Sequence, residues 1–378
     1  MQRDELAGWL RLALTPQLGT VGARRLLAAF GLPEAIFAQR EAALATVVDS
    51  AVATALRTPP EGFESQLEAT LAWLAQDPQR RQVLTLADAD YPAALLALDD
   101  PPPMLYRIGR TDATPQRALA MVGSRNATPQ GLQNARRFAS SFAQAGVTVV
   151  SGLALGIDGA AHEGALEGAA ADAVATIAVV GTGLDRVYPA RHRELAHRIA
   201  ERGMILSEYP LGTPPLAANF PRRNRLIAAL GQGTLVVEAA LQSGSLITAR
   251  LAAELGREVF AIPGSIHSPH ARGCHALLRH GAKLVESAQD VLEDLRFVLP
   301  AVAAPAAPAA EEPEGEEGEP AGEDPLLAAM GYDPIGLDAL IARTGIPAPR
   351  LSARLLELEL AGEVARLPGG LYQRQARA

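Results

Sequence analysis

A regular alternation of short apolar runs and helical patterns between residues 118 and 290 constrains the fold more than any other feature. Small-residue turns separate the runs from the helical patterns. The six expected strands are Ala118–Val122, Val147–Ser151, Val174–Val180, Met204–Ser207, Thr234–Val237 and Glu258–Ile262. Near-continuous apolar strands that alternate with amphipathic helices indicate a parallel sheet covered on both faces. We therefore predict an α/β fold built on a doubly wound, mostly parallel sheet.

The residues just before this region predict an extension of the same sheet. A strand is expected at Val83–Leu86, and an extended MLYRIG segment at 104–109 follows the triplet Pro101–Pro103. Such a triplet fits neither a helix interior nor a central strand, so it marks a connection. We expect these strands to add an edge to the sheet.

Residues 1–80 predict a helical module resembling sterile-α-motif or helix–hairpin–helix domains. Leu6, Trp9 and Leu10 give the first helix an apolar face, and LGTVGARRLL resembles a helix–hairpin–helix. Glycine amides of that motif can contact a DNA phosphate, whereas small helical modules also serve in packing and protein contacts. Both roles stay open.

The C-terminal part predicts a linker and a small domain. Residues 298–324 are rich in Ala and Pro and then acidic, with almost no large apolar residue, which indicates a disordered linker. Residues 325–378 have the helix, turn, helix, helix and Gly-Gly hairpin order of a winged helix. Its expected recognition helix has Arg350 and Arg354 but also Glu357 and Glu359, so DNA reading and protein contact both stay open. Residues 81–297 form the α/β domain between these parts.

Charge is unevenly distributed along the chain. The net charge is −8, but residues 311–324 contain eight acids and no base, so the rest sums to about zero. Residues 115–290 contain 17 Lys and Arg against 13 Asp and Glu. Because binding depends on where charge lies, the acidic total does not exclude nucleic acid as a partner.

The remaining composition indicates a cytoplasmic protein without a membrane span. The single cysteine, Cys274, excludes an internal disulfide and a Cys-based zinc site and fits a reducing compartment. The start MQRDELAG lacks an apolar signal segment, and no apolar run approaches the ~20 residues that a span needs. His267, His270 and His275 lie in one expected loop without paired carboxylates, so no metal site is expected.

The stretch from Phe220 to Ala249 contains the strongest binding signal. It combines the basic run FPRRNR with a Ser-Gly-Ser loop, 243–245, before a helix. Arginines contact phosphate oxygens, and a small-residue loop before a helix leaves backbone N–H groups available to do the same. An aromatic residue beside the arginines favours a nucleic-acid surface. The alternative is a solvated charge run beside an ordinary turn.

Six collinear motifs together resemble the DNA-processing protein A (DprA/Smf) family. They are MVGSRNATPQG, SGLALGIDGAAHEGAL, GTGLDRVYP, FPRRNRLIAAL, VVEAALQSGSLITA and VFAIPGS. The resemblance is strong over 83–290 and recognisable in LELELAGEVARLPGGLY near the C-terminus. It implies an extended Rossmann-like domain that binds single-stranded DNA as a homodimer in natural transformation and recombination. It also implies protection of incoming strands and help in loading the RecA recombinase, with no catalytic residue, metal or cofactor.

The resemblance also assigns site residues by position. The expected DNA-binding residues are Ser124, Arg125, Gly152, Phe220, Arg222, Arg223, Asn224, Arg225, Ser243, Gly244 and Ser245. Family members often have a Lys a few residues before the Phe-Pro pair, where this chain has Ala217, and Arg223 could compensate. Leu278 and Leu284 are the expected dimer-interface residues, with a core role as the alternative.

Two other classes of function stay open. A Rossmann-like sheet could support hydrolysis of the glycosidic bond of nucleoside monophosphates, which needs a carboxylate beside a phosphate loop. Glu238 precedes Ser243–Ser245, but GQGTLVVE lacks the preceding Pro-Gly of the PGG-x-GT-xx-E signature of such hydrolases. The alternative for Glu238 and Asp158 is to orient arginines and cap helices. The third class is an adaptor whose terminal modules recruit proteins while the α/β domain only dimerises.

Overall fold

The computed structural model describes residues 2–112, 115–297, 324–331 and 334–375. Within them, nine strands form one sheet in the order β1-β2-β6-β5-β4-β3-β7-β8-β9. The strands are β1 (Arg81–Thr85), β2 (Met104–Gly109), β3 (Ala118–Val122), β4 (Thr148–Ser151), β5 (Thr176–Val179), β6 (Met204–Ser207), β7 (Gly233–Val236), β8 (Glu258–Ala261) and β9 (Lys283–Leu284). The predicted α/β fold with a mostly parallel, doubly wound sheet is confirmed.

The predicted edge extension is also present. β1 pairs antiparallel with β2, and β2 pairs antiparallel with β6, whereas every pair from β6 to β9 is parallel. The short strand β9, which the sequence analysis did not predict, forms the opposite edge. Along the chain, β3 to β6 extend the sheet in one direction and β7 to β9 in the other. The strand order therefore reverses between β3 and β7.

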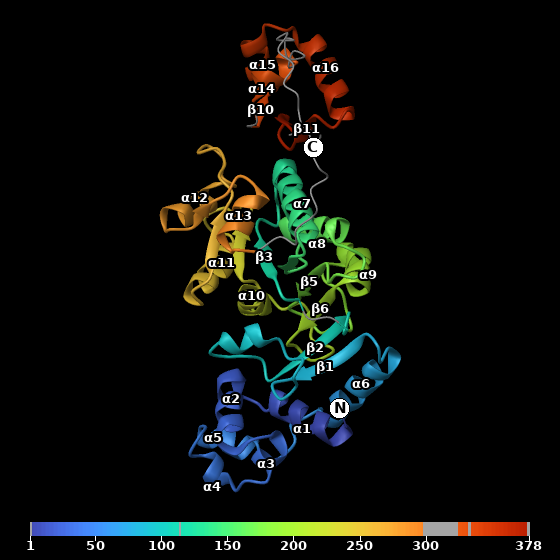
Figure 1. Ribbon diagram of the computed structural model, residues 1–378, viewed down its shortest axis with the longest axis vertical. Coiled ribbons are helices and arrows are strands. Elements are labelled where there is room, and N and C mark those ends of the chain that lie inside the picture. The colour runs from blue at the N-terminus through green and yellow to red at the C-terminus, as the bar shows by residue number, and fades with distance from the viewer. Residues whose placement is uncertain (1, 113–114, 298–323, 332–333, 376–378) are drawn as a thin grey trace, which may run out of the picture.

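Helices cover both faces of this sheet (Figure 1). In β3, Leu119 and Met121 pack in one hydrophobic cluster with α7 and α8, while Ala120 and Val122 pack in another with α10 and α11. The first face is covered by α7 (Pro129–Gln144), α8 (Ile157–Gly168), α9 (Arg193–Arg202) and α13 (Ala288–Asp294), and the second by α10 (Asn219–Leu230), α11 (Ser245–Glu254) and α12 (Arg272–Arg279). Burial of both sides of each central strand explains the continuous apolar runs.

The N-terminal helices pack directly on the antiparallel edge. They are α1 (Arg3–Leu14), α2 (Gly19–Phe30), α3 (Pro33–Phe37), α4 (Glu41–Leu44), α5 (Ser50–Ala55) and α6 (Phe63–Gln76). Their buried side chains belong to one hydrophobic cluster with Met104 and Tyr106 of β2. The rings of Trp73 and Tyr106 meet edge to face with centroids 5.7 Å apart, and the Thr70 and Tyr106 hydroxyls are 3.3 Å apart. The helical module and the sheet edge thus share one core.

The C-terminal unit has the winged-helix order that the sequence predicts. It contains α14 (Pro325–Met330), β10 (Ile335–Gly336), α15 (Leu337–Thr344), α16 (Ala348–Leu360), β11 (Val364–Leu367) and β12 (Leu371–Arg374), with the sheet order β10-β12-β11. Gly369 and Gly370 have φ angles of 84° and 74°, which the tight hairpin turn requires. On the expected recognition helix α16, Arg354 forms ion pairs with Asp324 (2.5 Å) and Glu357 (2.6 Å).

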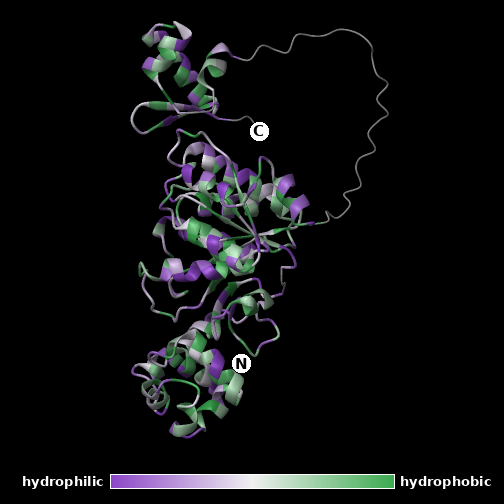
Figure 2. Cartoon of the chain, turned by 90° about the vertical axis from the view of Figure 1, so that its left-hand side faces the viewer, coloured by the Kyte–Doolittle hydropathy of each residue, from purple (hydrophilic) through white to green (hydrophobic). Residues whose placement is uncertain are grey.

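Residues 298–323 of the predicted linker lie outside the described residues. Asp324, the last residue of that predicted segment, instead belongs to the C-terminal unit, because its carboxylate accepts a hydrogen bond from the Leu326 backbone N–H (2.8 Å) and caps α14. Across the helices of the described chain, hydrophobic and hydrophilic stretches alternate (Figure 2). In the same residues, no helix has both the length and the apolar character that crossing a membrane would take.

Candidate nucleic-acid interface

A pocket of about 400 Å³ lies where the strand order reverses. Four segments contribute to it: residues 122–126 at the end of β3, Ala154 and Asp158 after β4, the α10 residues between 220 and 227, and residues 240–248 after β7. In open α/β sheets, ligands bind outside the carboxyl ends of the strands at such a reversal. The predicted site residues are therefore expected to lie at this pocket. We call it the switch-point pocket.

The turn after β3 presents Arg125 at this pocket. The Ser124 backbone N–H donates to the Glu238 carbonyl (2.8 Å), and the Ser124 carbonyl accepts from the Ile157 N–H (3.1 Å). Gly156 has a φ of 78°, and a Cβ there would lie 2.2 Å from the Ser124 carbonyl oxygen, so glycine is required. Two neighbouring loops thus hold the turn, while the Arg125 side chain stays exposed at the pocket wall.

Phe220 lies between a cation and a second aromatic ring. The Arg125 guanidinium carbon is 5.6 Å from the centroid of the Phe220 ring, and the Tyr188 ring centroid is 5.5 Å from it with a 37° tilt. Phe220 lines the switch-point pocket and Tyr188 is 47% exposed. The sequence analysis did not assign Tyr188 to the site. Its position in DRVYP, directly after a glycine-rich strand end, is the signal that could have indicated it.

Arg223 forms the floor of the pocket. It is 3% exposed, and its Nε and Nη1 atoms have no hydrogen-bond partner among the described residues. Burial lowers the pKa of the Arg223 guanidinium to about 10, with Asp158 opposing that effect, so the group stays charged at neutral pH. A buried cation with unsatisfied N–H donors is unfavourable alone and is suited to an anionic ligand.

Gly152 and Asp158 lie next to the Arg223 guanidinium, on the side away from the pocket opening. The Asp158 carboxylate accepts hydrogen bonds from the backbone N–H groups of Gly152 (3.1 Å) and Ala154 (3.3 Å). Burial raises the pKa of Asp158, and Arg223 and these two N–H groups oppose the increase. A Cβ on Gly152 would lie 1.8 Å from Arg223 Nη1. Gly152, one of the expected DNA-binding residues, is thus buried beneath the guanidinium and does not line the pocket.

The Ser243–Ser245 loop closes the opposite side. The Asn224 amide donates to the Gly244 carbonyl (3.3 Å), which links α10 to the loop. The Ser243 hydroxyl accepts from the Ser245 backbone N–H (3.3 Å) and lies 2.7 Å from the Ser245 hydroxyl. Gly244 is exposed, and a Cβ there would meet open space. Asn224, Ser243, Gly244 and Ser245, all among the expected DNA-binding residues, therefore line the pocket.

Arg222 and Arg225, which are also among the expected DNA-binding residues, do not line the switch-point pocket. Residues three, four and seven positions apart share one face of a helix, so Phe220, Arg223, Asn224 and Ile227 face the pocket while Arg222 and Arg225 do not. Arg222 is exposed and lines a separate cleft of about 260 Å³ with Thr20 and Tyr209.

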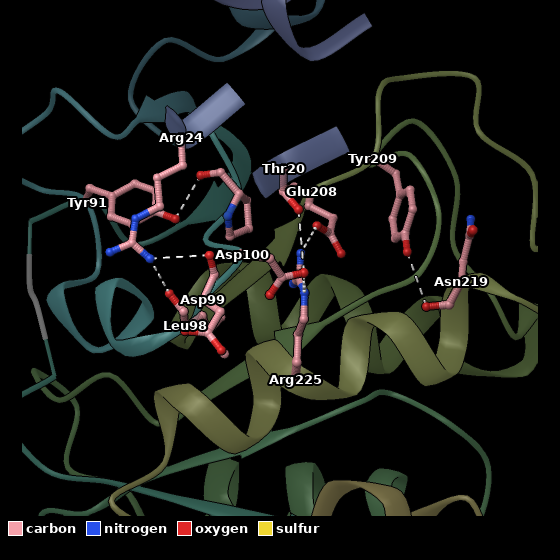
Figure 3. Close-up of polar contacts among 11 residues, drawn as sticks. Thr20, Arg24, Tyr91, Leu98, Asp99, Asp100, Glu208, Tyr209, Asn219 and Arg225 are labelled. Carbon is pink, nitrogen blue, oxygen red and sulfur yellow. Dashed lines mark hydrogen bonds and ion pairs between the residues drawn. The ribbon is translucent and has the colours of Figure 1, made fainter. Parts of the chain in front are cut away.

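Arg225 joins a buried ion-pair network instead (Figure 3). It is 7% exposed, and its guanidinium contacts Asp100 (2.8 Å) and Glu208 (2.6 Å). Burial opposes its charge, but these two carboxylates outweigh that effect and raise the pKa of Arg225. The N-terminal module contacts the same segment, because Arg24 donates to the Leu98 carbonyl (2.8 Å) and the Thr20 hydroxyl donates to Asp100 (3.5 Å).

Glu238, the candidate carboxylate of a hydrolase, is directed toward α7. It accepts hydrogen bonds from the Thr128 backbone N–H (3.0 Å) and hydroxyl (2.5 Å), and a Cβ on Gly131 would lie 2.3 Å from its Cδ. Burial raises the pKa of Glu238, and the Thr128 hydrogen bonds oppose the increase. Glu238 thus joins the end of β7 to the start of α7. Across the residues that the structure describes, no group of three or more His, Cys, Asp and Glu side chains is placed to hold a metal ion.

The two expected dimer-interface residues differ in exposure. Leu284 lies in β9, at the open edge of the sheet, and is 54% exposed. Leu278, on α12, is half-buried and packs against the hydrophobic cluster beneath α10 and α11. An edge strand with an exposed leucine is suited to pairing with another chain.

Comparison with known proteins identifies similar chains. Residues 82–296 match the model of the family described as DNA recombination-mediator protein A, and residues 303–370 match that of the DprA winged helix domain. Protein Smf of Escherichia coli is 45% identical over 315 residues, which cover 82% of each chain. Protein Smf of Synechocystis is 35% identical over 99% of this chain and all of its own length.

Two solved structures are similar as well. The X-ray structure of DNA processing protein A from Streptococcus pneumoniae has a TM-score of 0.62 and 35% identity, covering 78% of this chain and 98% of its own. DNA processing protein A from Helicobacter pylori, whose structure describes a single-stranded DNA binding mode, has a TM-score of 0.51 and 34% identity. It covers 57% of this chain and 96% of its own.

The buried network gives a stability prediction. Replacing Arg225 with Ala leaves the Glu208 carboxylate, whose side chain is 6% exposed, without its cation. We expect the free energy of unfolding to fall by about 3–5 kcal/mol in urea denaturation, because an uncompensated charge remains buried. Arg222→Ala, on the exposed side of the same helix, is the matched control and should change it by about 0.5 kcal/mol or less.

Adding Glu208→Gln to Arg225→Ala removes the unpaired charge and should restore part of the loss. Equal stability of Arg225→Ala and the wild type would contradict the network's structural role.

Proposed function

Since this chain belongs to the DNA recombination-mediator protein A family, we propose that it binds single-stranded DNA at the switch-point pocket. The observation that carries the proposal is Arg223, a buried guanidinium with unpartnered N–H donors at the floor of a pocket that also contains Arg125 and Phe220. The single-stranded DNA binding mode described for the similar Helicobacter pylori protein supports it.

Each part of the pocket has a separate role in the proposed binding. Arg125 and Arg223 neutralise backbone phosphates, and the loop at 243–245 lies where its backbone can approach the strand. Phe220 offers an aromatic surface to a base, and stacking of this kind tolerates any sequence. A duplex hides the faces of its bases, so the arrangement favours single strands. Phosphate contacts supply affinity that falls with salt.

Arg223 also offers a positive charge for a phosphate contact that the Ala217 side chain cannot make. Ala217, at the place where the family resemblance implies a Lys, is exposed in the segment before α10 and contributes no charge. We propose that Arg223, six residues later and packed over Gly152, supplies this phosphate contact from the pocket floor.

We extend the proposal to the biology that the family implies. The chain would act in the cytoplasm as a homodimer, protect incoming single strands during natural transformation, and help load RecA. Stimulation of RecA-catalysed strand exchange on DNA coated with single-strand-binding protein would support the last role. Absence of stimulation, with DNA binding intact, would contradict it. An adaptor that only dimerises would show no DNA affinity.

The DNA proposal predicts the behaviour of two variants. Fluorescence anisotropy with labelled oligothymidylate across a salt series should show weaker binding for Arg125→Ala and Phe220→Ala. Loss of base stacking costs about 1–3 kcal/mol, roughly 5- to 150-fold in Kd. The Arg125 variant should also lower the slope of log K against log salt by about 0.7, because one phosphate contact is lost.

Arg250→Ala is the matched control, since Arg250 is an exposed arginine of α11 that pairs with Glu254 outside the pocket. This variant should bind the single strand with the affinity of the wild type. The wild type should bind a duplex of the same length more weakly than the single strand. Duplex binding equal to single-strand binding, unaffected by either pocket variant, would place the DNA contact outside the switch-point pocket.

We further propose that binding involves no bond cleavage, because the Glu238 carboxylate is engaged by Thr128. Incubation with AMP should therefore release no ribose 5-phosphate in a chromatographic assay. Release that disappears in Glu238→Gln would support the hydrolase instead. Thermal unfolding of the variant checks that its fold is retained.

The open sheet edge predicts how the homodimer forms. Leu284→Glu places a charge on the exposed face of β9, and we expect light scattering to show a monomer where the wild type is a dimer. Leu241→Glu, which alters a similarly exposed leucine (56%) away from that edge, is the control. A dimer in the Leu284 variant would exclude this edge as the interface.

A further inference from the structure

A second pocket adjoins the switch-point pocket on the far side of Phe220. It has a volume of about 320 Å³ and lies between residues 184–188 and one face of α9. Tyr188 forms the boundary, because it lines this pocket while its ring packs on Phe220 of the first. We call it the α9 pocket.

The loop after β4 also connects the two pockets. Leu153 lines the α9 pocket and the next residue, Ala154, lines the switch-point pocket. Leu153 has a φ of 60°, unusual for a residue with a side chain, and its carbonyl is 3.0 Å from His192 Nδ1. The backbone there is held in a strained conformation that places consecutive residues in different pockets.

The α9 pocket is basic at its rim. Arg193 and His197 lie four residues apart on one face of α9, both exposed, and neither side chain has a hydrogen bond or ion pair within the described part of the chain. The one acidic residue in the lining, Asp185, is already engaged by Arg186 (2.9 Å) and by the Gly212 N–H (2.7 Å). Despite partial burial, these contacts hold the pKa of Asp185 below its ordinary value.

The wall behind this rim is apolar. Val180, Leu184 and Ala196 are buried side chains in the lining, and the exposed ring of Tyr188 lies beside them. An apolar wall and an aromatic ring accept the face of a base, and the Arg193 guanidinium and the His197 ring at the rim can donate hydrogen bonds to a phosphate. The pocket therefore combines the two chemistries of a nucleotide.

We propose that the α9 pocket is a second nucleotide subsite of the same DNA path. A single strand held in the switch-point pocket would continue over the paired rings of Phe220 and Tyr188 and place its next phosphate beside Arg193 and His197. The inference rests on the proposed binding of single-stranded DNA, and it adds the direction in which the strand leaves the first pocket.

Binding as a function of DNA length tests this path. Oligothymidylates from about four to about sixteen nucleotides are titrated against the full chain by anisotropy. The wild-type affinity should rise once the strand is long enough to reach both pockets. That rise should be lost in Tyr188→Ala and in the double variant Arg193→Ala/His197→Ala. For Tyr188→Ala, the affinity for long strands should fall roughly 5- to 150-fold, while the affinity for short strands should not change.

One conservative variant tests the ring, and one variant outside the pocket serves as the control. Tyr188→Phe keeps the ring and should retain the rise in affinity with length that Tyr188→Ala loses. Arg198→Ala removes an exposed arginine of α9 that is absent from the pocket lining, so it should not change the length dependence. Thermal unfolding midpoints establish that each variant is folded.

The outcomes separate this subsite from the first pocket. If Arg125→Ala and Phe220→Ala weaken binding while the α9-pocket variants match the wild type at every length, the second subsite is wrong and the first pocket stands. If Tyr188→Ala weakens all lengths equally, Tyr188 only supports Phe220, which also overturns the inference. If no variant of either pocket has an effect, the proposed function itself fails.

Photocrosslinking gives an independent reading. One 4-thiothymidine is placed in the part of an oligothymidylate that extends beyond the switch-point pocket. It should crosslink to a peptide containing residues 184–197, which mass spectrometry identifies. Crosslinks confined to other segments of the chain would contradict the path.

Discussion

The ion pairs of Arg225 with Asp100 and Glu208 fix the helix on which the binding pocket depends. Glu208 follows β6 and Asp100 precedes β2, so one guanidinium joins α10 to two strands near the antiparallel edge. Because α10 is rigid, anchoring Arg225 on one side also sets the position of Phe220 and Arg223 on the other. Arg225 thus lies outside the pocket lining and holds its neighbours in place through its ion pairs.

Much of the fold could be predicted from the sequence. Strands buried on both faces, such as β3, read as continuous apolar runs, and the glycine-rich turns after them mark the carboxyl edge of the sheet. The proline triplet before β2 marked the connection that leads into the predicted edge extension, whereas the antiparallel pairing of that extension was not predicted. The two-residue strand β9 was missed because Lys283–Leu284 is too short and too exposed to show an apolar run.

The candidate site was predictable only in part, because a basic run does not reveal which way each arginine points. FPRRNR lies on a helix, and the helical periodicity places Arg223 at the pocket and Arg225 against the carboxylates of Asp100 and Glu208, which are 125 and 17 residues away in sequence. Gly152 was expected among the DNA-binding residues, yet it is buried and leaves space for the Arg223 guanidinium. Tyr188 was overlooked because its contact with Phe220 joins segments that are separate in sequence.

The core shared by the N-terminal helices and β2 has a consequence for the solubility of shorter chains. Tyr106 is 1% exposed, and Trp73 and Thr70 of α6 are among the residues that contact it. A chain that began after residue 80 would present Met104 and Tyr106 to water beside the unprotected strand β1, an apolar sheet edge of the kind that aggregates. The helical module therefore covers apolar residues of β2 that the α/β domain alone would expose.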